Sequence, residues 1–310
     1  FVLLYISLIT GFFFDENLNL GAKPDWFTTD LPVINDLSID LQNTLLNYEI
    51  YNHRHSPVYL IFLSFLKKAG ISFEYIRLIH LNISILLIYF FFKCLSLKFS
   101  NVDKTILLIL SFSIFLSPTF RSLAIWPSSR LIGLLLFTIS ILEFLKYLKF
   151  KKKIYIWKNT FFLILSSYVS PNFSLFIFYF SYHYLKENDL KDFIPLYIFC
   201  LISSFPVFYY LIILDVNFLM VNTPGSISGE NISLSFNFSN KILLISSIIL
   251  FHLIPFLINR DFFKDIIKIS NTDLLIVSLF FIFLLYFFDY QIYYTGGGIF
   301  FQISNIFLKN

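Results

Sequence analysis

Long apolar runs, separated by short polar breaks, make up most of this chain. A membrane-spanning helix needs about 20 mainly apolar residues, within a range of roughly 17–25. Runs of this kind cover residues 1–14, 75–95, 105–120, 129–147, 159–185, 193–214, 241–258 and 273–290. The run 159–185 carries Ser170-Pro171-Asn172 in its middle, so we expect it to divide into two half-helices. The pattern therefore predicts an all-α, polytopic protein whose residues 1–310 form a single transmembrane domain of about nine spans.

Composition changes this picture only by excluding other classes of protein. Hydrophobic residues make up 57% of the chain and charged residues only 14%, whereas soluble domains have about 25% charged residues. The net charge of +4 comes from lysines clustered between apolar runs, which is typical of membrane topology signals and not of a nucleic-acid-binding surface. The chain begins at Phe1 and ends at Asn310, both beside apolar runs, and we expect both ends to be truncated.

The basic residues predict the orientation of the spans. Residues 146–158 contain six lysines, so this segment is expected on the cytoplasmic side. Alternation then places 93–104, 186–192 and 259–268 on the same side, and the four segments hold 14 of the 23 basic residues. The segment 15–74 becomes a long extracytoplasmic loop. We expect a multi-pass protein of the bacterial inner membrane with this loop outside the cytoplasm.

The long loop is expected to contain two interfacial helices. Apolar residues at helical spacing predict an amphipathic helix of about four turns, with Asp30 as N-cap and Pro32 in the first turn; the residues are Leu31, Ile34, Leu37, Leu41, Leu45 and Leu46. Such a helix would lie flat on the membrane with its apolar side down. The run 57–66 is too short to span and predicts a second interfacial helix.

Two short segments of this loop carry candidate chemistry. Asp25, in Gly21-Ala22-Lys23-Pro24-Asp25-Trp26, is a candidate general base beside an aromatic residue; the alternative is a solvated loop acid. Arg54 and His55 suit a lipid phosphate, with interface anchoring as the alternative. A divalent metal stays undecided, because His53 and His55 would need further ligands that the sequence does not identify.

Later segments add fewer candidates. Arg121 and Arg130 flank Trp126 in a short segment between two runs, and they are candidates for binding an anionic group, with ordinary headgroup contact as the alternative. The glycines 296–298 lack the Lys and Ser/Thr of a phosphate loop, which excludes a nucleotide site of that type. His80 and Asn82 are the best pair for ion transport within a span.

The layout of residues 1–150 resembles the GT-C glycosyltransferases, which are multi-pass enzymes that use polyprenyl-phosphate-linked sugars. The resemblance includes His55-Ser56-Pro57-Val58-Tyr59, where many members have two adjacent prolines and this chain has one. It also includes Arg77, the Arg121–Trp126-Pro127 loop and, more loosely, YTGGGIFFQIS at 294–304. In that superfamily an acid of the first extracytoplasmic loop is catalytic. Asp25 matches this position best and Asp30 is the second choice.

The resemblance implies a mechanism. Asp25 would take the proton from an acceptor hydroxyl of a glycan, lipid or protein, and Arg54, Arg121 or Arg130 would offset charge on the departing polyprenyl phosphate. The resemblance makes no cofactor certain, and a divalent metal stays possible because no clear second acidic motif decides metal dependence. The partners are the lipid bilayer, the sugar donor and the acceptor.

Three other functions stay open. An O-antigen polymerase or ligase usually has a later, Arg-rich outer loop, but residues 215–240 contain no basic residue. A flippase or transporter predicts internal repeats and polar groups at the membrane midplane, and the sequence shows no repeat. A structural membrane subunit would leave the acid-rich first loop unexplained.

Overall fold

The computed structural model describes residues 1–216, except Leu20, Asn52, Arg54, His55 and Asp189, together with Leu275, Ser278, Leu279 and Ile282. The chain divides into two compact units, Phe1–Pro224 and Gly225–Asn310. No described residue belongs to a β-strand, which confirms the all-α prediction. Leu275, Ser278, Leu279 and Ile282 are helical. The rest of the expected spans 241–258 and 273–290 lies outside the described residues.

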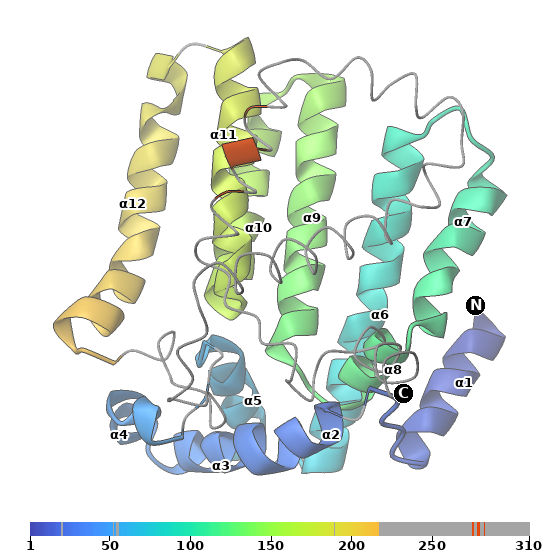
Figure 1. Cartoon of the computed structure of the whole chain (residues 1–310), viewed down its shortest axis with the longest axis vertical. Coiled ribbons are helices and arrows are strands. Elements are labelled where there is room, and N and C mark those ends of the chain that lie inside the picture. The colour runs from blue at the N-terminus through green and yellow to red at the C-terminus, as the bar shows by residue number, and fades with distance from the viewer. Residues whose placement is uncertain are drawn as a thin grey trace, which may run out of the picture. The chain divides into compact units, whose positions relative to one another are not determined.

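Three described helices are long and apolar enough to cross a membrane: α6 (Phe73–Lys98), α9 (Ser129–Phe150) and the helix Ile194–Ile213. The last consists of α12 (Ile194–Phe208) and the π turn η6 (Tyr209–Ile213). In Figure 1, the axes of α6, α9, α10 and α12 are roughly parallel, and α10 returns alongside α9. These elements agree with the spans expected at 75–95, 129–147 and 193–214.

Two of the expected spans differ from straight helices. The run 105–120 forms α7 (Lys104–Phe112) and the 3-10 turn η3 (Ser113–Leu116), and the chain then bends by 67° into α8 (Pro118–Ile125). The bend falls at Ser117, whose Oγ caps the new helix by accepting from Phe120 N at 3.3 Å, with Pro118 in the first turn. The first run forms α1 (Val2–Phe13), which has 12 residues and is shorter than a span.

The expected division of 159–185 is confirmed. Helix α10 (Lys153–Val169) ends before an extended Ser170, and the 3-10 turn η4 (Pro171–Leu175) leads into α11 (Phe176–Glu187). Proline disfavours a helical conformation in the residue before it, which explains the break. The short element η5 (Leu190–Phe193) then connects to α12.

Helices α9 and α10 pack closely through small and polar residues. Ser166 Oγ donates to the Gly133 carbonyl at 2.9 Å, and Asn159 Nδ2 donates to the Ser140 carbonyl at 2.9 Å. Tyr184 of α11 donates to Asn159 Oδ1 at 2.8 Å. Small residues and interhelical hydrogen bonds are the usual means of association between helices that face lipid.

Gly133→Ala is expected to lower the free energy of unfolding by about 1–3 kcal/mol, the usual cost of overpacking. A Cβ at Gly133 would lie 2.6 Å from Ser170 Cβ and 3.2 Å from Phe173 Cε2, and this clash outweighs the helix propensity that alanine adds. Thermal unfolding of the purified protein measures the effect. Gly21→Ala is the matched control, because a Cβ at Gly21 would lie no closer than 3.9 Å to its nearest neighbour. Equal melting temperatures for both variants would contradict the close packing.

The long first loop forms a layer of short helices that runs across one end of α6 and α9 (Figure 1). It consists of α2 (Ala22–Asp25), the π turn η1 (Trp26–Asp30), α3 (Leu31–Ile39), α4 (Leu41–Leu46), the 3-10 turn η2 (Tyr48–Tyr51) and α5 (Val58–Lys68). We call these elements the helical layer. Since α9 ends at Phe150, the lysine-rich turn lies at the opposite end of α9 from this layer.

Two predictions about this layer are wrong in detail. Asp30 is not an N-cap, because α2, η1 and α3 are continuous and Asp30 itself has helical dihedral angles. The cap lies upstream, where Asn19 Oδ1 accepts from the backbone of Gly21 and Ala22 at 3.2 and 3.1 Å. The four-turn helix is also interrupted at Asp40, which is extended and caps α4 through Asn43 N at 3.0 Å.

Part of the apolar side of the layer is buried in the protein, whereas Leu46 of α4 is exposed. Val33, Ile34 and Leu37 of α3 belong to one core cluster with Leu60 and Leu63 of α5. The prediction of a short helix at 57–66 is confirmed, because α5 has 11 residues and is too short to span. Since α3 and α5 bury their apolar residues in this shared core, the positions of the side chains that they carry are fixed by protein contacts.

Candidate functional site

Asp30 and His53 form the most buried charged contact of the helical layer. His53 Nε2 lies 2.5 Å from Asp30 Oδ1, and the two side chains are only 2% and 13% exposed, respectively. Asp30 ends the single π turn of the layer, a distortion that is frequent at functional sites. His53 follows η2 and reaches back across the layer to Asp30.

Burial raises the pKa of Asp30 above its ordinary value of 3.8, although the hydrogen bond from His53 opposes the shift. The negative charge of Asp25 raises this pKa further, and the positive charge of Arg130 lowers it. Asp25 and Arg130 are both exposed on the surface. The charge of Arg130, which is remote in the sequence, therefore acts on the same carboxylate as the charge of Asp25, which is only five residues away.

Tyr48 contacts the other ring nitrogen of His53. Its hydroxyl lies 2.9 Å from His53 Nδ1, and the tyrosine is fully buried. Burial raises the pKa of Tyr48 well above its ordinary value, and the nearby charge of Asp30 adds to the shift. Tyr48 is therefore a neutral phenol at physiological pH.

A second buried histidine, His80, connects the helical layer to α6 and α8. Tyr59 Oη of α5 lies 2.5 Å from His80 Nδ1 of α6, and His80 Nε2 donates to the Leu123 carbonyl at 2.8 Å. His80 joins α5, α6 and α8, and both of its ring nitrogens are satisfied. Asn82 is exposed and accepts from Tyr5 Oη at 3.0 Å, so the pair considered for ion transport does not act together.

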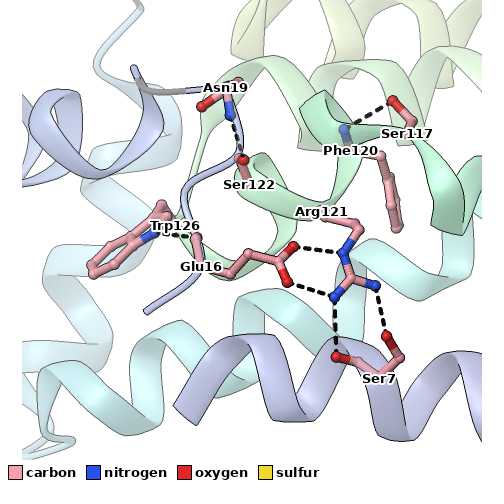
Figure 2. Close-up of polar contacts among 8 residues, drawn as sticks. All are labelled: Ser7, Glu16, Asn19, Ser117, Phe120, Arg121, Ser122 and Trp126. Carbon is pink, nitrogen blue, oxygen red and sulfur yellow. Dashed lines mark hydrogen bonds and ion pairs between the residues drawn. The ribbon is translucent and has the colours of Figure 1, made fainter. Parts of the chain in front are cut away.

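Arg121 lies in a different polar cluster, between α1 and α8 (Figure 2). Its Nε and Nη2 donate to the two Glu16 carboxylate oxygens at 2.5 and 2.7 Å, and Nη1 and Nη2 donate to Ser7 Oγ and the Ser7 carbonyl at 3.1 and 3.0 Å. Trp126 Nε1 donates to the Glu16 carbonyl at 3.0 Å. Four of the five guanidinium N–H groups are therefore used within the protein, which favours a structural role for Arg121 over phosphate binding.

Asp15 forms a third cluster just after α1. It has a left-handed φ of 53° and accepts from Arg77 Nη2 at 2.8 Å and from Lys23 Nζ at 3.1 Å. Burial alone would raise its pKa, but the hydrogen bonds from Arg77 and Lys23 outweigh this and lower the pKa below its ordinary value. The Arg77 guanidinium also stacks on Trp126, 3.6 Å from the ring centroid. Arg77 thus joins α6 to the segment after α1.

The predicted site residues separate into three groups. The charges of Asp25 and Arg130 both act on Asp30, while Arg121 is paired with Glu16. Arg54 and His55 lie outside the described residues, as do the glycines 296–298. Among the described residues, no three His, Cys, Asp or Glu side chains are grouped so that they could hold a metal ion.

Sequence reasoning missed the roles of His53 and Tyr48, and of Glu16. The sequence indicates His53 only as one member of a histidine pair. One signal was available for Glu16: the pair Asp15-Glu16 directly follows an apolar run, and such charges need partners near a membrane. No sequence signal connects Asp30 with His53, which is 23 residues away.

Comparisons with known proteins add no identity. No family model, no curated protein and no solved structure matches this chain.

Proposed function

We propose that this protein is a membrane glycosyltransferase of the GT-C type, which transfers a sugar from a polyprenyl-phosphate donor to a hydroxyl acceptor outside the cytoplasm. One observation carries the proposal: the buried Asp30 carboxylate, a second carboxylate on Asp25 and the exposed Arg130 guanidinium lie close enough to influence the same titration. A raised carboxylate pKa near another acid is typical of groups that move protons in catalysis. A nearby arginine suits a phosphate leaving group.

The position of the helical layer supports the proposed topology. The layer lies at the end of α9 opposite the lysine-rich turn 146–158, and lysine-rich segments are usually cytoplasmic. On this reasoning, Asp25, Asp30 and Arg130 face the extracytoplasmic side, where a lipid-borne sugar would meet an acceptor. A cysteine introduced at the exposed Asp40 should react with a membrane-impermeant maleimide in intact cells.

The proposed reaction is a single displacement. A carboxylate of the pair takes the proton from the acceptor hydroxyl, and the acceptor oxygen forms a bond to the anomeric carbon of the donor. The bond between that carbon and the phosphate oxygen breaks, and polyprenyl phosphate leaves with the electron pair. Arg130 offsets the charge on the departing phosphate. The anomeric configuration is inverted, and the proton remains on the carboxylate until solvent removes it.

Label transfer tests this proposal. The full-length protein, reconstituted in vesicles of bacterial lipid extract that supply acceptors, is given undecaprenyl-phosphate hexoses with a radiolabelled sugar. We expect labelled product and free undecaprenyl phosphate with the wild-type protein and neither with the Asp25→Asn/Asp30→Asn double variant. Turnover by the double variant at the wild-type rate, or no turnover by wild type with any hexose, would overturn the proposal.

Asp36→Asn is the matched control for this assay. Asp36 lies on α3, is exposed, and accepts a hydrogen bond from Tyr51 Oη at 2.6 Å, which an asparagine carbonyl can also accept. This variant makes the same chemical change on the same helix, so it should retain wild-type transfer.

A further inference from the structure

Three side chains of the helical layer form a continuous hydrogen-bonded array, Asp30–His53–Tyr48. His53 Nε2 lies 2.5 Å from Asp30 Oδ1, and His53 Nδ1 lies 2.9 Å from Tyr48 Oη. Both ring nitrogens are engaged and the ring is 2% exposed. His53 therefore has no nitrogen available for a substrate, and any effect that it has on chemistry must act through Asp30.

An ionised Asp30 can only accept hydrogen bonds, and this decides the proton on the near ring nitrogen of His53. His53 therefore carries a proton on Nε2 and donates it to Asp30 Oδ1. Burial raises the pKa of Tyr48, so its phenol keeps its proton, and its oxygen lies 2.9 Å from His53 Nδ1. The hydrogen bond from His53 fixes the carboxylate plane and leaves Asp30 Oδ2, which has no hydrogen bond among the described residues, to accept a proton.

We infer that Asp30 accepts the proton of the acceptor hydroxyl, that His53, held by Tyr48, is its positioning residue, and that Asp25 tunes Asp30 without taking the proton. The inference rests on the proposed function and divides the roles within its acid pair. Asp25 differs from Asp30 because it is exposed and its carboxylate has no hydrogen-bond partner among the described residues. An oriented base within a packed site transfers protons more efficiently than a solvated one.

The charges around Asp30 give opposite expectations for different variants. The His53 hydrogen bond lowers the pKa of Asp30, whereas the Asp25 charge raises it and the Arg130 charge lowers it. The charge of Asp30 also acts on Tyr59 of α5, and Tyr59 is neutral because burial raises its pKa. Tyr48 in turn lies near Tyr210. Arg54 and His55, adjacent in sequence to His53, lie outside the described residues.

The pH dependence of transfer tests the division of roles. His53→Phe removes the donor to Asp30, so the acid limb of the kcat/KM profile should move to higher pH. The kcat should fall by less than the contribution of the general base itself, which is about 10²–10⁴-fold. His53→Gln can still donate an N–H to Asp30, so it should restore much of the wild-type pH profile and of the wild-type kcat. Asp25→Asn should move the acid limb in the other direction, to lower pH. An unchanged profile in His53→Phe with wild-type thermal stability would overturn the inference.

Nuclear magnetic resonance separates this inference from the proposed function. In protein with ¹⁵N-labelled histidine, the His53 signals are identified by their loss in His53→Gln. We expect a ring protonated on Nε2, and a shift of these signals in Asp30→Asn and in Tyr48→Phe. A ring without a proton on Nε2 would overturn the array even if transfer occurs. An intact array in a protein that transfers no sugar would instead remove the proposed function, and with it the role of Asp30 as proton acceptor.

Discussion

Asp30→Asn is expected to reduce sugar transfer by about 10²–10⁴-fold, the usual contribution of a general base, while the protein stays folded. An amide cannot accept the proton of the acceptor hydroxyl, but it has nearly the shape of the carboxylate and can still hydrogen-bond His53. Initial rates of label transfer by Asp30→Asn, wild type and the Asp36→Asn control measure the effect. Transfer by Asp30→Asn within a factor of a few of wild type would remove Asp30 from the catalytic role.

The same variant gives an expectation for stability that follows from the raised pKa of Asp30 and not from its role in catalysis. Burial raises the pKa of Asp30 in the folded state above 3.8. Between pH 3.8 and that raised pKa, the folded state therefore binds more protons than the unfolded state. The free energy of unfolding of the wild type should therefore fall across that window. The amide of the Asp30→Asn variant does not titrate, so the melting temperature of the variant minus that of wild type should increase from pH 4 towards neutral pH and then level off.

This stability result also tests the geometry directly. If the ion pair with His53 stabilised the fold in its charged form, Asp30→Asn would lose stability with rising pH relative to wild type. Melting curves at a series of pH values distinguish the two cases. An Asp30→Asn variant that is less stable than wild type at pH 8 but equal to it at pH 4 would contradict the raised pKa.

Glu16→Gln is expected to lower the free energy of unfolding by about 3–5 kcal/mol, because it leaves Arg121 as a largely buried cation without its carboxylate. The two side chains are 18% and 12% exposed and share two hydrogen bonds. Gly11 also packs against this pair, since a Cβ there would lie 2.5 Å from Glu16 Oε2. Thermal unfolding of Glu16→Gln, Arg121→Gln and the double variant gives the coupling energy of the pair.

Lys23→Gln is the matched comparison for this ion pair. Lys23 and Asp15 form an exposed pair, with side chains 37% and 46% exposed, and such pairs contribute about 0–1 kcal/mol. We therefore expect Lys23→Gln to change stability far less than Glu16→Gln. If Arg121→Gln instead keeps the wild-type melting temperature and loses sugar transfer, Arg121 belongs to the donor site as the resemblance to GT-C enzymes implies.

Hydrophobic runs and proline positions were enough to predict most of the helical skeleton. Backbone polar groups in an apolar run must be satisfied within the run, so a run of about 20 apolar residues predicts a helix without knowledge of its neighbours. The break at Ser170-Pro171 follows from the local sterics of proline. The short helix after Pro57 follows from the length of its apolar run.

Pairing between distant side chains was decided by the tertiary structure alone. A sequence pattern constrains residues a few positions apart, whereas Asp30 meets His53 across 23 positions and Arg121 meets Glu16 across 105. The continuous helix through Asp30 likewise depends on packing that no local pattern records. Composition and spacing thus determined that the described part of the chain is helical and where most of its apolar helices lie. Folding decided which acids are buried, which arginines are paired and which histidine holds Asp30, because burial and ion pairing depend on contacts between segments that are remote in the chain.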